Sequence, residues 1–233
     1  RGALYARYGA ALGANAHYRV YALGHSQNSS AGAGLKATDQ WDGGRSGLRL
    51  DWAVSERDEL FVSADYYRGE AEQTYDIVWS LEPPYRRVFV ENSKYNGGHA
   101  LARWQRNWSA DKNGSLQVYY DRHDLDDAVF SEERNTLDVE GQLNARHGRH
   151  AWAVGGGYRF SDDATWGATL SALNPADLGI KLLSAFVQDD IALAHERVYL
   201  TLGSKIEHND FTGFEIQPNA RLLWRVHKRQ SVW

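Results

Sequence analysis

Period-two alternation of apolar and polar residues runs through almost the whole chain, and this feature most constrains the fold. Residues 137–145 show it most clearly, because Leu, Val, Gly, Leu and Ala share one face while Asp, Glu, Gln and Asn share the other. Strict alternation indicates a β-strand with one apolar and one polar face. The pattern recurs at residues 48–54, 60–66, 116–121, 198–207 and 214–222, and more weakly at residues 3–12, 17–24, 100–108, 151–160 and 182–193.

These segments predict an all-β fold of long antiparallel strands. They amount to about eleven strands, and a twelfth begins near Ser231. Most approach the ~9–11 residues with which a tilted strand crosses a bilayer, whereas strands of soluble proteins usually have about 5–6. The sequence contains no linker, no second domain, no amphipathic helix and no apolar run near the ~18–20 residues of a membrane helix. Arg1 is not followed by a signal-peptide pattern.

The predicted connections between the strands alternate in length. Short ones lie at residues 13–15, 55–58, 109–114, 147–149, 194–196 and 227–230, and long ones at residues 25–44, 70–96, 122–133 and 161–181. The connection at residues 210–213 is short where a long one is due. Short turns on one side and long loops on the other are typical of bacterial outer-membrane barrels. The sequence therefore predicts a transmembrane antiparallel β-barrel.

The two predicted faces support the same conclusion. Charges recur on the polar face in strand after strand: Arg49 with Asp51, Asp138 with Glu140, Lys205 with Glu207, and Glu215 with Arg221. A soluble barrel or sandwich buries its inner face, so these charges favour a wet or plugged lumen and a lipid-facing apolar band. Aromatic residues near strand ends fit interfacial girdles, although sheets favour such residues anyway: Trp52, Trp104, Trp108, Trp152, Trp224, Tyr66 and Tyr120. A soluble all-β binding domain is the alternative.

Composition excludes several classes of function. The 233 residues contain no Cys, which excludes a disulfide framework, a thiolate metal site and a Cys nucleophile. The formal net charge of −4 gives no footprint for a nucleic-acid partner. The chain also contains no Met, so we expect an internal or processed piece of a longer protein.

No motif in the sequence indicates an enzyme, a metal site or a cofactor. His147 and His150 flank a predicted turn, which is more simply a solvated turn than a metal site. Asp189 and Asp190 are adjacent on a strand, so their side chains point to opposite faces and form no carboxylate pair. A barrel protease or lipase would need a Ser/His/Asp cluster at the loop rim, and no such spacing occurs.

Two of the long predicted loops carry the candidate ligand-binding residues. The loop at residues 25–44 ends near the first of them, and the loop at residues 70–96 carries the rest: Trp41, Tyr75, Trp79, Tyr85, Arg86 and Arg87. Aromatic faces beside Arg can hold a flat anionic iron chelate by stacking and charge-assisted hydrogen bonds. The same residues could instead stabilise a long loop or contact lipopolysaccharide phosphates.

Three segments near the C-terminus carry a more specific resemblance. AFVQDDI at residues 185–191 is similar to the FxQD strand of TonB-dependent receptor barrels. LTLGSKIEHN at residues 200–209 and FTGFEIQPNARLLW at residues 211–224 resemble the two segments that follow that strand in the family, with matching spacing. The resemblance implies that residues 1–233 are part of a barrel of about 22 strands. The N-terminal plug domain of the family, with its TonB-binding motif, is absent from this sequence.

The resemblance also implies a function and a location. The family takes up scarce nutrients, most often ferric siderophores or similar iron complexes, by TonB-driven transport across the bacterial outer membrane. TonB would bind through the missing N-terminal region, and outer-membrane lipid and lipopolysaccharide would surround the barrel. A passive porin or structural barrel is the alternative, and a plug domain upstream of Arg1 would discriminate the two.

Overall fold

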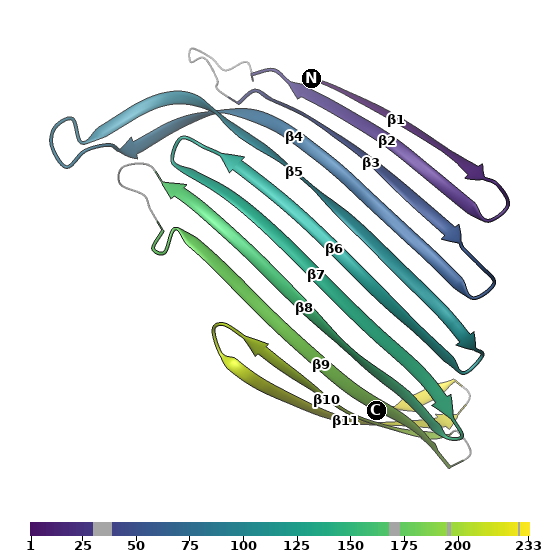
Figure 1. Cartoon of the computed structure of the whole chain (residues 1–233). Coiled ribbons are helices and arrows are strands. Elements are labelled where there is room, and N and C mark those ends of the chain that lie inside the picture. Colours follow the sequence, from purple (N-terminus) through teal and green to yellow (C-terminus); the bar gives the residue numbers. More distant parts are fainter. Residues whose placement is uncertain (30–38, 168–172, 195–196, 228) are drawn as a thin grey trace.

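The computed structural model describes residues 1–29, 39–167, 173–194, 197–227 and 229–233. Within them, twelve strands form one antiparallel sheet in sequence order (Figure 1). The strands are β1 (Gly2–Leu12), β2 (Ala16–Gln27), β3 (Trp41–Ala53), β4 (Asp58–Val78), β5 (Arg86–Ser109), β6 (Lys112–Asp126), β7 (Phe130–His147), β8 (His150–Gly167), β9 (Asp177–Leu193), β10 (Val198–Asn209), β11 (Gly213–His227) and β12 (Gln230–Val232). The predicted all-β antiparallel fold is confirmed. The described residues include no helix long and apolar enough to span a membrane.

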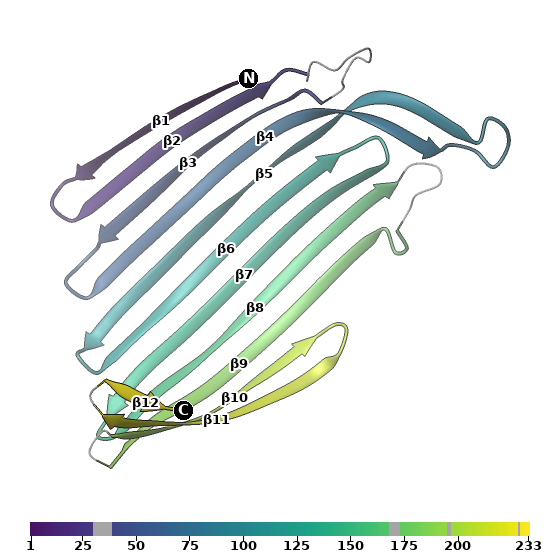
Figure 2. The same ribbon diagram turned by 180° about the vertical axis from the view of Figure 1, so that it is seen from behind.

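The sheet is a curved wall rather than two stacked layers. Figure 1 shows β1 to β9 side by side, with β10, β11 and β12 turning beneath β9, and Figure 2 shows the same curvature from behind. Ala16 and Tyr75 are the buried hydrophobic residues of the described part of the chain. A soluble sandwich of this length would bury a substantial apolar core, so this sheet does not have the packing of a soluble domain.

Cross-strand register gathers the predicted apolar positions on one face of the whole sheet. Val139 on β7 lies opposite Val118 on β6 and Tyr158 on β8, and Tyr158 lies opposite Leu183 on β9. The large side chains of this face are exposed, for example Leu183 at 58%. A contiguous exposed apolar surface of this extent requires an apolar environment, as a lipid-facing band would have.

Five tryptophans mark the short-turn end of this apolar face. Each lies close to the end of its strand nearest a short turn and is between 37% and 52% exposed: Trp52, Trp104, Trp108, Trp152 and Trp224. Gly114 makes room for one of them, because a Cβ there would lie 3.0 Å from Cζ3 of Trp108 and 2.6 Å from Cδ2 of Leu143. The arrangement matches the predicted interfacial girdle.

The long predicted loops are mostly wrong. β4 continues to Val78 and β5 begins at Arg86, so most of residues 70–96 form a paired hairpin of 21- and 24-residue strands joined by residues 79–85. β6 and β7 likewise continue through much of residues 122–133, and β8 and β9 through much of residues 161–181. Apolar–polar alternation reports contact with an apolar phase, and strands that project beyond it lose the pattern while keeping their backbone pairing. Residues 30–38 and 168–172 of the predicted loops lie outside the described residues.

Asp189 and Asp190 do point to opposite faces, as their adjacency predicts. Asp189 lies opposite Trp152 on the apolar face, and its Oδ2 is 2.6 Å from Nδ1 of His150. Asp190 lies on the polar face, where its Oδ1 accepts a 2.5 Å hydrogen bond from Oγ1 of Thr201. His150 therefore pairs with a carboxylate at the short-turn end of the apolar face.

Candidate functional site

The polar face of the sheet is concave and lined by charged and amide side chains. One cavity of about 410 Å³ on this face is lined from Arg103 on β5 to Lys205 on β10. Strands that are not neighbours can share a cavity only where the sheet bends toward that face. Lys205 binds Glu207 at 2.6 Å between Nζ and Oε1, so two charges of the predicted polar face pair as expected. This face has the character of a wet lumen.

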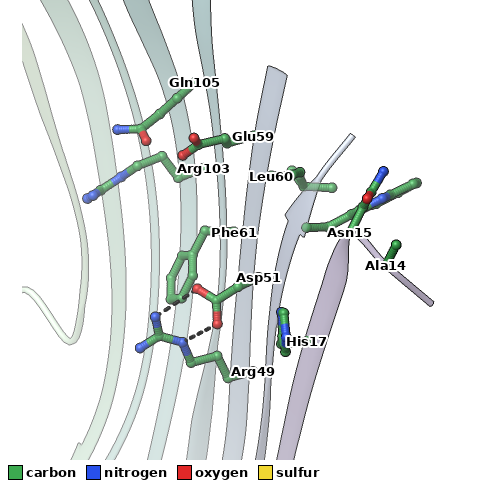
Figure 3. A pocket seen from close by; sticks show the side chains of 12 residues that line it. Ala14, Asn15, His17, Arg49, Asp51, Glu59, Leu60, Phe61, Arg103 and Gln105 are labelled. Carbon is green, nitrogen blue, oxygen red and sulfur yellow. Dashed lines mark hydrogen bonds and ion pairs between the residues drawn. The ribbon is translucent and has the colours of Figure 1, made fainter. Parts of the chain in front are cut away.

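A second cavity lies at the short-turn end of the polar face, where β3 meets β4 and β5 (Figure 3). Its volume is about 600 Å³. Arg49 donates two hydrogen bonds of 2.7 Å to the carboxylate of Asp51, and its Cζ lies 4.8 Å from the ring centroid of Phe61. The charge of Arg49 is therefore neutralised within the wall, whereas Arg103, which also lines the cavity, donates its hydrogen bonds to the neutral amide oxygen of Gln117.

Asp65 is the centre of a cluster midway along the polar face. Its side chain is 5% exposed and accepts hydrogen bonds from Arg45, one of them 3.2 Å from Nε. The hydroxyl of Tyr21 lies 3.4 Å from Oδ2, and Nδ1 of His99 lies 3.2 Å from Oδ1. The centroid of the Tyr119 ring lies 5.8 Å from the centroid of the His99 ring. Side chains from β2 to β6 thus converge on one buried carboxylate.

Glycines on neighbouring strands allow this convergence. A Cβ at Gly47 would lie 2.6 Å from the ring of Tyr21, so only glycine lets that ring cross β3 toward Asp65. Gly97 does the same for Tyr67, whose hydroxyl lies 3.0 Å from Nδ1 of His123. Tyrosine facing glycine across a strand pair is a known way to cover the bare backbone. The cluster was not predicted from the sequence, although a tyrosine facing a glycine on a neighbouring strand would have indicated it.

The β4–β5 hairpin is fastened to the β6–β7 turn by Tyr75. Its hydroxyl donates a 2.6 Å hydrogen bond to Oδ2 of Asp127. The carboxylate also accepts a 3.0 Å hydrogen bond through Oδ1 from the N–H of Val129, and Ser93 beside it is 5% exposed. Figure 1 shows this hairpin projecting past β6 and β7. We call the Tyr75–Asp127 contact the hairpin latch.

Above the latch, three of the predicted ligand-binding residues form one cluster with Phe89. The ring of Tyr75 stacks on that of Phe89 at 5.3 Å between centroids, and the Trp79 ring meets Phe89 edge-on at 6.3 Å. Cζ of Arg87 lies 4.7 Å from the Trp79 ring and 5.3 Å from the Phe89 ring. We call Tyr75, Trp79, Arg87 and Phe89 the tip cluster. It presents a guanidinium on aromatic faces, with no carboxylate partner among the described residues.

The other three predicted residues lie apart from the tip cluster. Arg86 points to the opposite face of the hairpin and donates 3.0 and 2.6 Å hydrogen bonds to the carboxylate of Asp76. Tyr85 lies in the connection and is 56% exposed. Trp41 begins β3, with its ring 4.5 Å from that of His25. Alternation along β5 explains the separation of Arg86 from Arg87, since neighbours on a strand face opposite ways.

Both residues of the hairpin latch have shifted pKa values, that of Tyr75 upward and that of Asp127 downward. Burial raises the pKa of Tyr75 to about 12, and the hydrogen bond to Asp127 acts in the same direction. Burial alone would raise the pKa of Asp127, but hydrogen bonds from Tyr75, Val129 and Ser93 outweigh it and hold that pKa below its ordinary value of 3.8. The stabilisation that the Asp127 carboxylate gives the folded state is therefore present above about pH 4. It is lost as pH falls through the pKa that Asp127 has in the folded state. The stabilisation that the protonated Tyr75 hydroxyl gives the folded state is present below about pH 10 and is lost as pH rises toward 12.

Removing the Tyr75 hydroxyl is expected to loosen the hairpin without unfolding the sheet. Tyr75→Phe keeps the stack on Phe89 but leaves Asp127 without that donor, which costs about 1 kcal/mol, or roughly fivefold in local opening. Amide hydrogen exchange of residues 75–93 at pH 7 measures the change, with Tyr85→Phe as the control. The difference from wild type should shrink as pH falls through the lowered pKa of Asp127, where its carboxylate becomes protonated. An unchanged exchange rate at pH 7 would show that the Tyr75–Asp127 hydrogen bond does not stabilise the hairpin.

Among the described residues, no group of three or more His, Asp or Glu side chains is arranged to hold a metal ion. The described side chains form an aromatic and cationic tip, a buried carboxylate cluster and a charged concave wall. Such a surface can bind and guide an anionic, partly aromatic solute.

The sequence matches no protein-family model and no curated protein. Solved structures do match. The siderophore receptor PirA from Pseudomonas aeruginosa aligns with a TM-score of 0.67 at 14% identity, over 95% of this chain and 36% of its own. PirA from Acinetobacter baumannii gives a TM-score of 0.69 at 12% identity, over 97% of this chain and 38% of its own. A mutant of the ferric enterobactin receptor PfeA from Pseudomonas aeruginosa, in complex with enterobactin, gives 0.64 at 14% identity, over 98% and 40%.

These matches establish the fold. The chain has the fold of a stretch of the barrel wall of outer-membrane siderophore receptors, and the predicted resemblance to TonB-dependent receptor barrels is confirmed at that level. The matched proteins are receptors rather than enzymes. The chain spans 36–40% of the length of the three receptors described.

Proposed function

We propose that this chain is part of an outer-membrane receptor that takes up a ferric siderophore or a similar iron complex with energy from TonB. The observation that carries the proposal is the alignment of nearly the whole sheet with siderophore receptors. The apolar outer band, the tryptophan girdle and the charged concave face are what a barrel of this kind needs in its membrane and lumen.

The tip cluster suits the entry step of such a receptor. It lies on the polar face at the end of the sheet away from the short turns, which is the extracellular end of a bacterial outer-membrane barrel. The Arg87 guanidinium stands over the Trp79 and Phe89 rings. A flat anionic chelate could stack on the rings and receive hydrogen bonds from the guanidinium.

Energy-dependent uptake tests the function directly. The full-length protein that contains this chain is expressed in cells without other siderophore receptors, and uptake of radioactive iron is measured for a panel of siderophores. We expect saturable uptake of at least one complex, abolished by a protonophore or by deletion of TonB. Uptake that persists without energy and rises linearly with solute concentration would instead favour the passive porin.

A further inference from the structure

A row of cross-strand neighbours on the polar face has an arginine at each end, close to the short turns. Arg146 on β7 lies opposite Ala151 on β8, and Ala151 lies opposite Asp190 on β9. Asp190 lies opposite Thr201 on β10, and Thr201 lies opposite Arg221 on β11. The three residues between the arginines have short side chains, so they leave room above the middle of the row.

A cavity of about 890 Å³ lies over this row. Four arginines line it, since Arg149 in the turn between β7 and β8 and Arg225 on β11 join Arg146 and Arg221. Cζ of Arg225 lies 4.8 Å from the ring centroid of Tyr199 on β10. Figure 2 shows the sheet curling at this end, where β11 and β12 turn beneath β9. We call this cavity the arginine pocket.

The protein itself does not neutralise the four arginines. Among the described residues, none of the four forms an ion pair or a hydrogen bond through its guanidinium. Asp190 also lines the pocket, but neutral groups hold its carboxylate: Oγ1 of Thr201 at 2.5 Å and Nε2 of Gln188 at 3.3 Å. Further along the same face, by contrast, Nε of Arg159 lies 2.8 Å from Oδ2 of Asp138. The arginine pocket therefore carries an excess of positive charge that an anion can neutralise.

The arginine pocket has the size and the chemistry of a site for an anionic small molecule. Sites for such molecules usually enclose about 300–1,000 Å³, and this cavity falls within that range. A guanidinium binds a carboxylate or another pair of anionic oxygens through two parallel hydrogen bonds. Stacking on Tyr199 orients Arg225 in advance, so less side-chain freedom is lost when an anion binds.

We propose that the arginine pocket is a second binding site for the anionic iron complex, at the exit end of its path through the receptor. This inference rests on the proposed function, in which the tip cluster is extracellular and the short turns are periplasmic. The complex leaves the Arg87 site and binds again at the four arginines before it enters the periplasm. The arginines are exposed, so water and salt screen their charge and keep this second site weak enough for release.

Binding of iron complexes to the purified full-length receptor tests the site. Equilibrium dialysis with radioactive iron measures the affinity for ferric enterobactin and ferric citrate, which are anionic, and for ferrichrome, which is uncharged. Every receptor carries Arg87→Ala, which weakens the tip cluster, so the remaining binding reports the arginine pocket. Adding Arg221→Ala with Arg225→Ala should lower the affinity for an anionic complex about a hundredfold, because two charged hydrogen-bond donors are lost.

A matched control removes the same charge elsewhere on the polar face. Arg7 on β1 and Arg19 on β2 lie on that face, because Arg7 is opposite Tyr21 and Arg19 is opposite Arg49. Arg7→Ala with Arg19→Ala should lower the affinity less than about threefold. Heat-modifiable mobility on gels confirms that each variant is folded. If the Arg221, Arg225 variant does not fold, Arg146→Ala with Arg149→Ala removes two arginines from the other side of the pocket, and the same hundredfold loss is expected.

Several outcomes would overturn the proposal. Unchanged affinity in the Arg221→Ala, Arg225→Ala variant, an equal loss in the control, or no saturable binding of either anionic complex would show that the pocket is no such site. Equal affinity for ferrichrome would show that negative charge is not recognised. A less stable ligand-free variant with unchanged binding would show that the arginines contact a protein segment instead. Iron uptake by cells is measured separately, so lost energy-dependent uptake with a retained difference in binding overturns the transport proposal alone.

Discussion

Val139→Arg is expected to destabilise the folded receptor by about 2–4 kcal/mol, because it places a charge on the lipid-facing band near its middle. Val139 lies in a continuous apolar row between Val118 and Tyr158. Gln142→Arg is the matched change on the same strand. Gln142 is exposed on the polar face and lies opposite Ser115 and Gly155, so its substitution is expected to cost within about 0.5 kcal/mol.

A urea titration of the full-length receptor folded into lipid vesicles measures both costs. Asp138 is a less suitable control for the polar face, although alternation alone would recommend it. Its side chain is 8% exposed, and Oδ2 accepts a 2.8 Å hydrogen bond from Nε of Arg159. Even Asp138→Asn therefore weakens an ion pair. Equal destabilisation by Val139→Arg and Gln142→Arg would mean that the two faces are wrongly assigned.

Arg87→Ala is expected to weaken capture of the ferric ligand by about ten- to a hundredfold, the effect of losing hydrogen bonds from a charged donor. Arg86→Ala, one residue away, is expected to change affinity less than about twofold, because Arg86 faces outward and is bound to Asp76. Arg87→Lys keeps the charge but loses the planar fork, so it should fall between wild type and Arg87→Ala.

Binding of the radioactive ferric complex to intact, de-energised cells measures these affinities without transport. Surface expression of each variant is checked by antibody labelling. If Arg87→Ala binds as wild type does, or if both alanine variants lose affinity equally, the tip cluster does not contact the ligand. Comparison of Arg87→Ala with Arg86→Ala thus distinguishes a binding site on one face of the hairpin from a general effect of positive charge.

Most of the strand pattern could be predicted from the sequence because alternation records which face meets an apolar phase. Residues 137–145 and 198–207 lie within β7 and β10 with the predicted faces. Alternation predicts a loop for the hairpin extension of β4 and β5, because both faces of that extension meet water. The extension is rich in β-branched and aromatic residues that favour strands: Tyr75, Ile77, Val78, Val88 and Val90. Strand propensity therefore indicates the two strands where alternation does not.

The candidate sites were harder to predict because they depend on register. Arg86 and Arg87 are equivalent in composition, and only their alternation along a strand separates the ion-paired side chain from the stacked one. Asp65 meets Arg45 and His99 because three strands align, and nothing local in the sequence fixes that alignment.

We propose that this sheet crosses the outer membrane with the β4–β5 hairpin outside and the β3–β4 turn in the periplasm. Since these residues contain no Cys, single cysteines report position cleanly. Glu82→Cys lies in the hairpin connection and Glu56→Cys in the turn, and both side chains are exposed. A membrane-impermeant maleimide added to intact cells should label Glu82→Cys, and it should label Glu56→Cys only after the outer membrane is permeabilised. Labelling of Glu56→Cys but not Glu82→Cys on intact cells would contradict the orientation, and equal labelling of both would contradict the membrane placement itself.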